Sequence, residues 1–221
     1  MSRLLMVSGD SAAVRGEHGP FYNTLSELSR GWDYIDVLTP PAAGAGRTDL
    51  FGNVSLHPSP RSRLAQPWYI LNQGKALPRP DLIVSHDYGL FLNGLGAAWL
   101  SAALKVPYVS EIHHVEGYPR AASLRERIQP ALTRAYVTWA RRRARAFRIV
   151  NSGELKPLLL SWGVPEAQLL LLYSLYLDLG VFRPGPIEPD YDALFCGRLQ
   201  ANKAPMLFIE SLALARQQLG K

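Results

Sequence analysis

Cysteine is almost absent from this sequence of 221 residues, which contains only Cys196. A single cysteine cannot build a disulfide framework or a cysteine-based zinc site. The hydrophobic fraction of 48% is nevertheless that of a globular protein, and a chain of this length can bury a sizeable core without disulfides. We therefore expect an ordinary globular protein that is stabilised by packing.

Long apolar runs are also lacking. The run Met1–Val7 reaches polar Ser8 too soon for a signal peptide. The longest uncharged stretch, Tyr88–Leu104, contains Asn93, Gly94 and Gly96 and falls short of the ~20 apolar residues that span a bilayer. We interpret it as a buried helix and expect a cytoplasmic protein that is at most peripheral to a membrane.

Several chemical motifs are missing. Neither G-x-G-x-x-G nor G-x-x-x-x-G-K-[ST] occurs, which argues against dehydrogenases and P-loop proteins. His113 and His114 have no third ligand at helical spacing and no cysteine partner, so no metal site is expected. The sequence gives no reason to expect a cofactor.

Positive charge is in excess, with a net charge of +6, which favours an anionic partner. Arginines gather on or just after an expected helix, Leu124–Arg145, with two aromatic residues among them: Arg134, Tyr136, Trp139, Arg141, Arg142, Arg143, Arg145 and Arg148. Such a cluster can hold a protein on anionic lipid at about 1 kcal/mol per basic residue. A solvated helix face is the alternative explanation. No motif indicates nucleic-acid binding, and none is expected.

Short apolar runs alternate with longer periodic segments. The expected strands are Arg3–Val7, Tyr34–Thr39, Leu82–Ser85, Tyr108–Ile112, Phe147–Val150, Leu169–Tyr173 and Ala193–Cys196. The expected helices are Tyr22–Arg30, Leu90–Leu104, Leu124–Arg145, Glu154–Trp162 (with Ser152 as its N-cap) and Met206–Leu219. This alternation predicts an α/β fold, a Rossmann-like parallel sheet with helices on both faces.

A domain boundary is expected in the segment Arg183–Pro189, which contains three prolines and a glycine. We predict a Rossmann-like domain over residues 1–186. Residues 187–221 would hold the linker and the first strand–helix unit of a second, incomplete domain, because one strand and one helix cannot form a core alone.

Polar residues follow many of the expected strands: Gly9–Gly19, Ser85-His86-Asp87, His113-His114, Asn151-Ser152, and Gly197-Arg198 with Lys203. His57, after Val54–Leu56, could belong to a further strand. Ligands of open α/β sheets bind at the carboxyl ends of the strands, so these residues are candidates for a binding site. A histidine at such a position can also simply cap the sheet.

The order of these segments resembles the retaining glycosyltransferases of the GT-B fold, specifically glycosyltransferase family 4 (group 1). The resemblance rests on the loop and helix Gly19–Leu28, on Pro80–Asp87, Val106–His113, Ala146–Ser152, Gly163–Pro165 and Asp178–Pro184, and on Leu194–Leu199 with Lys203-Ala204. His113 lies six residues after Pro107, so it rather than His114 corresponds to the active-site histidine of the family.

The resemblance implies transfer of a sugar from a nucleotide-sugar donor to a sugar or lipid-linked acceptor, with retention and without a bound metal. It implies that His113 contacts the donor sugar or the acceptor and that Gly19 lets its loop approach the substrates. His86 would belong to the same substrate-binding set. Arg198 and Lys203 would stabilise the departing diphosphate, a role suited to a guanidinium and an ammonium.

The carboxylates that the family carries in its C-terminal domain would lie beyond Lys221, so we expect this chain to be inactive alone. Three segments depart from the family pattern: His18-Gly19 stands in place of Gly-Gly, Leu175-Tyr176 in place of Asn-Gly, and Ala204 in place of glycine. A non-catalytic binding module that lacks the donor half is therefore an alternative. A third is an unrelated Rossmann-like enzyme acting on a phosphorylated ligand.

Overall fold

The computed structural model describes residues 1–44, 46–60, 62–173, 183–185, 188, 190–200 and 203–220. The chain divides into two compact units. The first contains Met1–Glu116 and Gln129–Tyr176, and the second contains Gly117–Ile128 and Leu177–Lys221. The predicted boundary near residue 186 stays a prediction.

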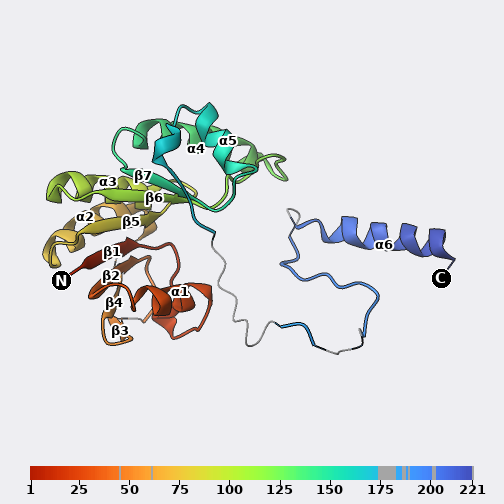
Figure 1. Ribbon diagram of the computed structural model, residues 1–221, viewed down its shortest axis with the longest axis horizontal. Coiled ribbons are helices and arrows are strands. Elements are labelled where there is room, and N and C mark those ends of the chain that lie inside the picture. The colour runs from red at the N-terminus through yellow and green to blue at the C-terminus, as the bar shows by residue number, and fades with distance from the viewer. Residues whose placement is uncertain are drawn as a thin grey trace. The chain divides into compact units, whose positions relative to one another are not determined.

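The first unit is built on one sheet of eight strands in the order β3-β4-β2-β1-β5-β6-β7-β8 (Figure 1). Their bounds are β1 (Arg3–Val7), β2 (Tyr34–Thr39), β3 (Thr48–Leu50), β4 (Val54–Pro58), β5 (Leu82–His86), β6 (Tyr108–Ile112), β7 (Ala146–Ile149) and β8 (Leu169–Leu171). All neighbours are parallel except β3, which pairs antiparallel with β4. The predicted Rossmann-like fold is confirmed, with an antiparallel edge strand that the sequence analysis missed.

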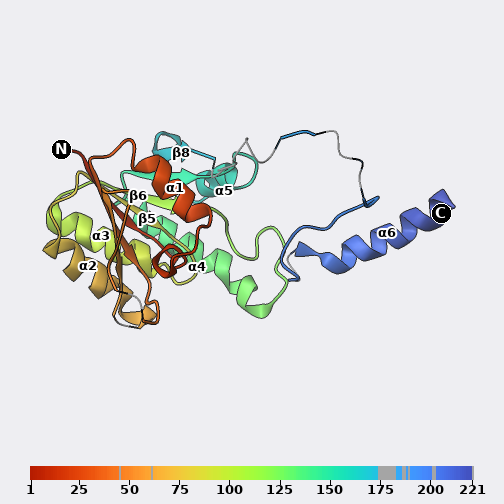
Figure 2. The same cartoon turned by 90° about the horizontal axis from the view of Figure 1, so that it is seen from below.

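Helices cover both faces of the sheet. Their bounds are α1 (Pro20–Leu28), α2 (Gln66–Ala76), α3 (Leu92–Leu104), α4 (Leu124–Ala140) and α5 (Leu155–Ser161). Figure 2 shows α1 on one side of the sheet and α2 and α3 on the other. Among the described residues, none of the helices combines the length and the apolar character needed to cross a membrane.

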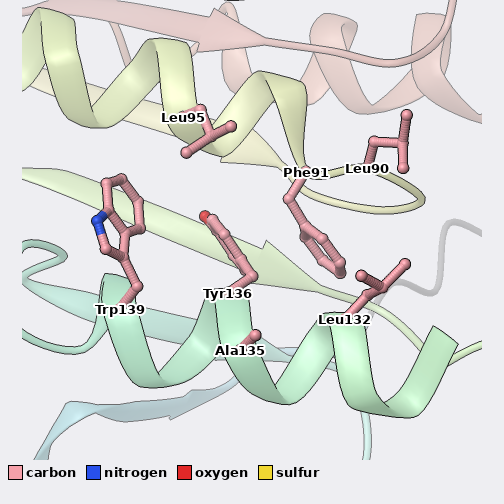
Figure 3. A pocket seen from close by; sticks show the side chains of 7 residues that line it. All are labelled: Leu90, Phe91, Leu95, Leu132, Ala135, Tyr136 and Trp139. Atoms are coloured by element: carbon pink, nitrogen blue, oxygen red, sulfur yellow. The ribbon is translucent and has the colours of Figure 1, made fainter. Parts of the chain in front are cut away.

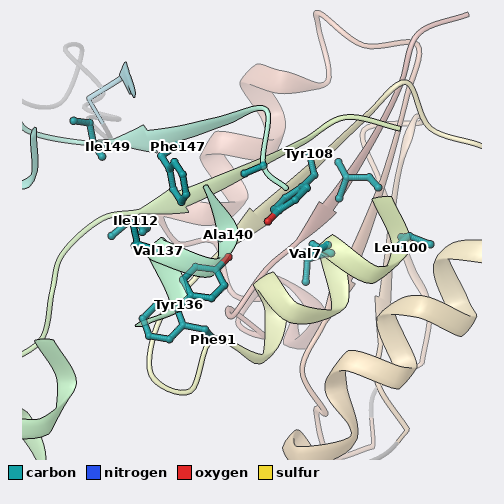
Figure 4. Close-up of a cluster of buried hydrophobic side chains, with 14 of the residues drawn as sticks. Val7, Phe91, Leu100, Tyr108, Ile112, Tyr136, Val137, Ala140, Phe147 and Ile149 are labelled. Carbon is teal, nitrogen blue, oxygen red and sulfur yellow. The ribbon is translucent and has the colours of Figure 1, made fainter. Parts of the chain in front are cut away.

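Alternate residues of the strands point to opposite faces of the sheet and contribute to two apolar cores, one on each face. Leu4 and Met6 pack in the core that contains Leu25 of α1, whereas Leu5 and Val7 pack in the core under α2–α5 (Figure 4). Because both faces are covered, the central strands are apolar at nearly every position. This explains why β1 and β2 have the bounds that their apolar runs predict; β6 also has its predicted bounds, although Ser110 and Glu111 lie within it.

Several expected bounds were wrong. Helix α4 ends at Ala140 rather than Arg145, because the amide of Arg145 already donates to the carbonyl of Tyr108 at the sheet. Helix α5 is capped by Asn151 rather than Ser152: the Asn151 Oδ1 accepts the amides of Glu154 at 3.0 Å and Leu155 at 2.9 Å. Helix α2 was not predicted. Its buried face includes the polar Gln66 and two residues of helix-breaking types, Pro67 and Gly74, so the sequence shows no apolar helical pattern there.

The second unit contains the expected carboxyl-terminal helix, α6 (Pro205–Leu219). The strand expected over residues 193–196 is absent: these residues are described and have no regular structure. A strand needs a neighbour to satisfy its backbone amides and carbonyls, and the described part of the second unit contains no other strand.

Gly94 of α3 allows the close approach of α4 to the sheet. A Cβ at this position would overlap the Tyr136 hydroxyl and crowd the Asp87 carboxylate. We expect Gly94→Ala to lower the free energy of unfolding by about 1–2 kcal/mol, because overpacking outweighs the gain in helix propensity. Urea denaturation measures the change. Gly153→Ala is the control: its Cβ would meet no atom within 4 Å, and a change within about 0.5 kcal/mol is expected. Equal effects at the two glycines would contradict the packing argument.

Candidate functional site

Polar side chains from three neighbouring strands meet at the carboxyl edge of the sheet. The strand register places His86 of β5 beside Glu111 of β6, and Glu111 beside Arg148 of β7. His113 follows directly after β6, and its ring lies 4.4 Å from that of His86 between centroids. We call these four residues, His86, Glu111, His113 and Arg148, the edge cluster.

An ion pair holds the edge cluster together. Arg148 Nη1 donates to Glu111 Oε1 at 2.6 Å, and the other oxygen, Oε2, lies 3.7 Å from Nε2 of His113. The Glu111 side chain is only 11% exposed. Burial by itself would raise the pKa of Glu111, but the hydrogen bond with His113 and the charge of Arg148 outweigh it, so this pKa is held below its usual value. Glu111 is therefore a buried anion at neutral pH.

The two histidines of the edge cluster differ in their surroundings. Burial, reinforced by the neighbouring His113, lowers the pKa of His86 to about 4, so this ring is neutral at physiological pH. A neutral imidazole offers one donor and one acceptor. The His113 side chain is 26% exposed and can reach a ligand at the open side of the sheet. Such a pair is suited to hydrogen bonding with hydroxyl groups.

Asp87, next to His86, is a second buried carboxylate. Its Oδ2 accepts hydroxyl hydrogen bonds from Ser85 at 2.9 Å, Ser110 at 2.5 Å and Tyr136 at 2.7 Å. Its amide donates to the carbonyl of Glu111, which ties it to the edge cluster. No cation balances its charge among the contacts described, and burial raises its pKa to about 7 despite the three hydroxyl donors.

Of the five predicted site residues, His86 and His113 are in contact. Gly19 is the N-cap of α1, and a Cβ there would meet no atom within 4 Å, so its loop has open space beside it. Arg198 and Lys203 lie exposed in the second unit, where the Lys203 amide donates to Gln200, and the Gln200 amide to Arg198. The proposed roles of all five residues stay predictions.

Glu111 was not among the predicted site residues, and Asp87 was noted only as one of the polar residues that follow a buried strand. Arg148 was grouped with the arginines on or just after the basic helix; it lies in β7, within the strand expected over Phe147–Val150, and pairs with Glu111. The available signal was a charged residue inside each of two apolar strands, which the register makes neighbours. Among the described residues, no group of three His, Cys, Asp or Glu side chains could share a metal ion.

The remaining arginines of the basic cluster are not equivalent. Arg141 Nη1 donates to the carbonyl of Gly163 at 2.5 Å, which fastens the end of α4 to the turn after α5. Arg142 and Arg145 are exposed. Arg143 is also exposed, and its guanidinium stacks on Trp139, 4.3 Å from the ring centroid.

The sheet and the helices on its two faces define a Rossmann-like α/β domain. Residues 17–174 match the model of Glycosyltransferase Family 4, and the chain belongs to this family, as predicted. No curated protein matches the chain.

Solved structures show the same fold. The crystal structure of HepE from Anabaena in complex with UDP and glucose has a TM-score of 0.54 and 17% identity, and the match covers 100% of this chain and 50% of that chain. The HepE complex with UDP has a TM-score of 0.52 and 16% identity, with the same coverage. The fold is thus that of the GT-B glycosyltransferases. The chain spans about half the length of these structures.

The raised pKa of Asp87 makes stability depend on pH. Between about pH 4 and pH 7 the folded protein keeps a proton that the unfolded chain releases, so this group's contribution to stability falls as the pH rises. Relative to Asp87→Asn, the free energy of unfolding of the wild type should fall by roughly 2–4 kcal/mol across this range. Urea denaturation at several pH values tests it. The exposed Asp190→Asn is the charge-matched control, and parallel pH curves for Asp87→Asn and wild type would contradict the prediction.

Proposed function

We propose that this chain supplies the acceptor-side half of a retaining glycosyltransferase, which transfers a sugar from a nucleotide-sugar donor to an acceptor. One observation carries the proposal: in a member of Glycosyltransferase Family 4, His113 lies at the open carboxyl edge of the sheet and is held there by Glu111, Arg148 and His86. A ring held from several sides keeps its position when a substrate binds, which favours a catalytic or orienting role.

In this proposal His113 hydrogen-bonds the donor sugar or the acceptor beside the reacting carbon. His86, neutral at physiological pH, offers a further donor and acceptor to the same hydroxyl groups. Gly19 lets its loop approach the substrates. Arg198 and Lys203 neutralise the diphosphate as the sugar–phosphate bond breaks. The reaction needs no bound metal or other cofactor. UDP-glucose is the first donor to test, because the HepE structure holds UDP and glucose.

The acceptor is a sugar or a lipid-linked sugar, and the protein works at an anionic membrane surface. The observation behind this part is the exposed positive charge of Arg142, Arg143 and Arg145 at the end of α4. Arg141 belongs to the predicted surface as well, although its guanidinium is bonded to Gly163.

A non-catalytic binding module remains the second candidate. The observation in its favour is Ala204, which replaces the glycine of the family motif beside Lys203 and adopts a left-handed backbone conformation with φ of 50°. That conformation is unfavourable for alanine and natural for glycine. A catalytic site would favour glycine at this position, whereas a binding module that has lost catalysis can tolerate alanine.

The transfer reaction predicts unequal roles for two adjacent histidines. In the complete protein encoded by the gene, His113→Ala should lower kcat/KM for transfer by at least about 100-fold, as is typical for loss of a group that stabilises the transition state. His114→Ala, an exposed neighbour, should stay within a few-fold of wild type. Release of UDP measures the rate, and NMR of the anomeric proton tests retention.

Each result decides between the two candidates. Near-normal turnover by His113→Ala would remove the role assigned to that residue. An inverted product would remove retention. A complete protein that binds UDP-glucose but never transfers the sugar would establish the binding module instead.

A further inference from the structure

An apolar groove lies between α4 and the start of α3, with a volume of about 270 Å³ (Figure 3). Its lining is Leu90, Phe91, Leu95, Leu132, Ala135, Tyr136 and Trp139. The lining contains one hydroxyl group, that of Tyr136, and this group is directed away from the groove because it donates to the buried Asp87. The groove therefore offers a ligand an almost purely apolar surface.

The floor of the groove is fixed in place. The rings of Phe91 and Tyr136 are stacked with centroids 4.4 Å apart and planes at 11°. Tyr136 is anchored through its hydroxyl, and Phe91 holds a left-handed backbone conformation with φ of 56° that the stacking supports. At the rim, Leu90 is 61% exposed and Leu132 is 40% exposed. Two exposed leucines over a rigid aromatic floor form a site that is ready before a ligand arrives.

Positive charge borders the groove along α4. A second, shallower hollow shares Ala135 and Trp139 with the groove and is otherwise lined by Ala131, Arg134, Thr138, Arg142 and Arg143. The guanidinium of Arg143 lies over the Trp139 ring, at the junction of the two hollows. The apolar and the cationic surfaces are thus continuous.

Acidic residues are missing from both walls. The sequence has no Asp or Glu between Asp87 and Glu111, which covers the α3 wall, and none between Glu126 and Glu154, which covers the α4 wall. An anionic ligand would therefore meet no nearby negative side chain from these two segments. The charge of the groove is complementary to an anionic amphiphile.

We propose that this groove takes one acyl chain of an anionic membrane lipid, with the phosphate of the lipid headgroup bound by Arg142 and Arg143. The proposal deepens the membrane part of the proposed function and does not depend on sugar transfer. It differs from a purely electrostatic surface in one respect: the apolar lining contributes to binding as well as the arginines.

Vesicle binding tests the groove separately from the charge. The 221-residue protein should bind vesicles of equal parts phosphatidylcholine and phosphatidylglycerol at least 10-fold more tightly than vesicles of phosphatidylcholine. Leu132→Gln changes no charge, and it should weaken binding to the anionic vesicles by 5- to 10-fold. Leu64→Gln is the matched control, because Leu64 is 70% exposed and lies outside the groove. It should bind as the wild type does.

The arginines have their own control. Arg142→Gln should weaken binding to the anionic vesicles by about 5-fold. Arg30→Gln removes the same charge from an exposed ion pair with Glu27 and should have little effect. Phosphatidylglycerol with brominated acyl chains should quench tryptophan fluorescence, and part of the quenching should disappear in Trp139→Phe.

The outcomes separate this proposal from the broader one. If Leu132→Gln and Leu64→Gln bind equally well while Arg142→Gln binds weakly, no chain enters the groove and only the charged surface remains. If brominated chains quench the wild type and Trp139→Phe equally, the groove is likewise excluded. If the wild type does not bind anionic vesicles, both the lipid groove and the charged membrane surface are excluded. The proposed transfer reaction is tested separately by the activity of His113→Ala.

Discussion

Glu111 places a negative charge inside the sheet, and the neighbouring residues are arranged around that charge. A buried carboxylate without a partner costs several kcal/mol, so Arg148 on the next strand is needed to balance it. The pairing works because β6 and β7 are parallel and in a register that makes the two residues direct neighbours. Once Glu111 is fixed, its second oxygen is available to His113, and its backbone carbonyl to Asp87.

The buried carboxylates Glu111 and Asp87 at the carboxyl edge of the sheet respond to burial in opposite ways. Glu111 has a cation and a histidine within reach, so its pKa is lowered and it stays charged. Asp87 has three hydroxyl donors and no such cation among its described contacts, so its pKa is raised to about 7. Hydroxyl groups stabilise a carboxylate less than a full positive charge does. The edge of the sheet thus carries one permanent negative charge, and another whose presence depends on pH.

The parts that could be predicted from sequence are those governed by local patterns. Strands β1 and β2 have their predicted bounds because they are largely apolar on both faces, whereas β3 is a short edge strand without an apolar run. The prediction of a strand at residues 193–196 was wrong, because an apolar run does not form a strand without a neighbouring strand to pair with. His86 and His113 could be found because His86 is the last residue of the buried strand β5 and His113 directly follows β6.

Glu111 and Arg148 could not be found in the same way, whereas Asp87 directly follows β5 and is within reach of the same reasoning. From sequence alone, a charged residue in a strand is expected to be exposed to solvent. Only the strand order and the register show which residue lies beside it in the sheet and can pair with it. Arg148 illustrates the point: the sequence groups it with the arginines of α4, but the register places it against Glu111. The roles of Gly19, Arg198 and Lys203 depend on the family resemblance.

Asp87 connects the edge cluster to the apolar groove, since it follows His86 in the chain and holds the hydroxyl of Tyr136 on the groove floor. Contact alone does not make this connection a switch, because coupling between sites requires an element with two alternative arrangements. The floor shows the opposite character: Tyr136 is stacked, hydrogen-bonded and packed against Gly94, where no additional atom fits. Binding of a ligand in the groove would therefore displace the residues of the floor very little. Its effect would be to hold the sheet edge in a constant orientation to the lipid surface, so that His113 meets a membrane-borne acceptor from a fixed side.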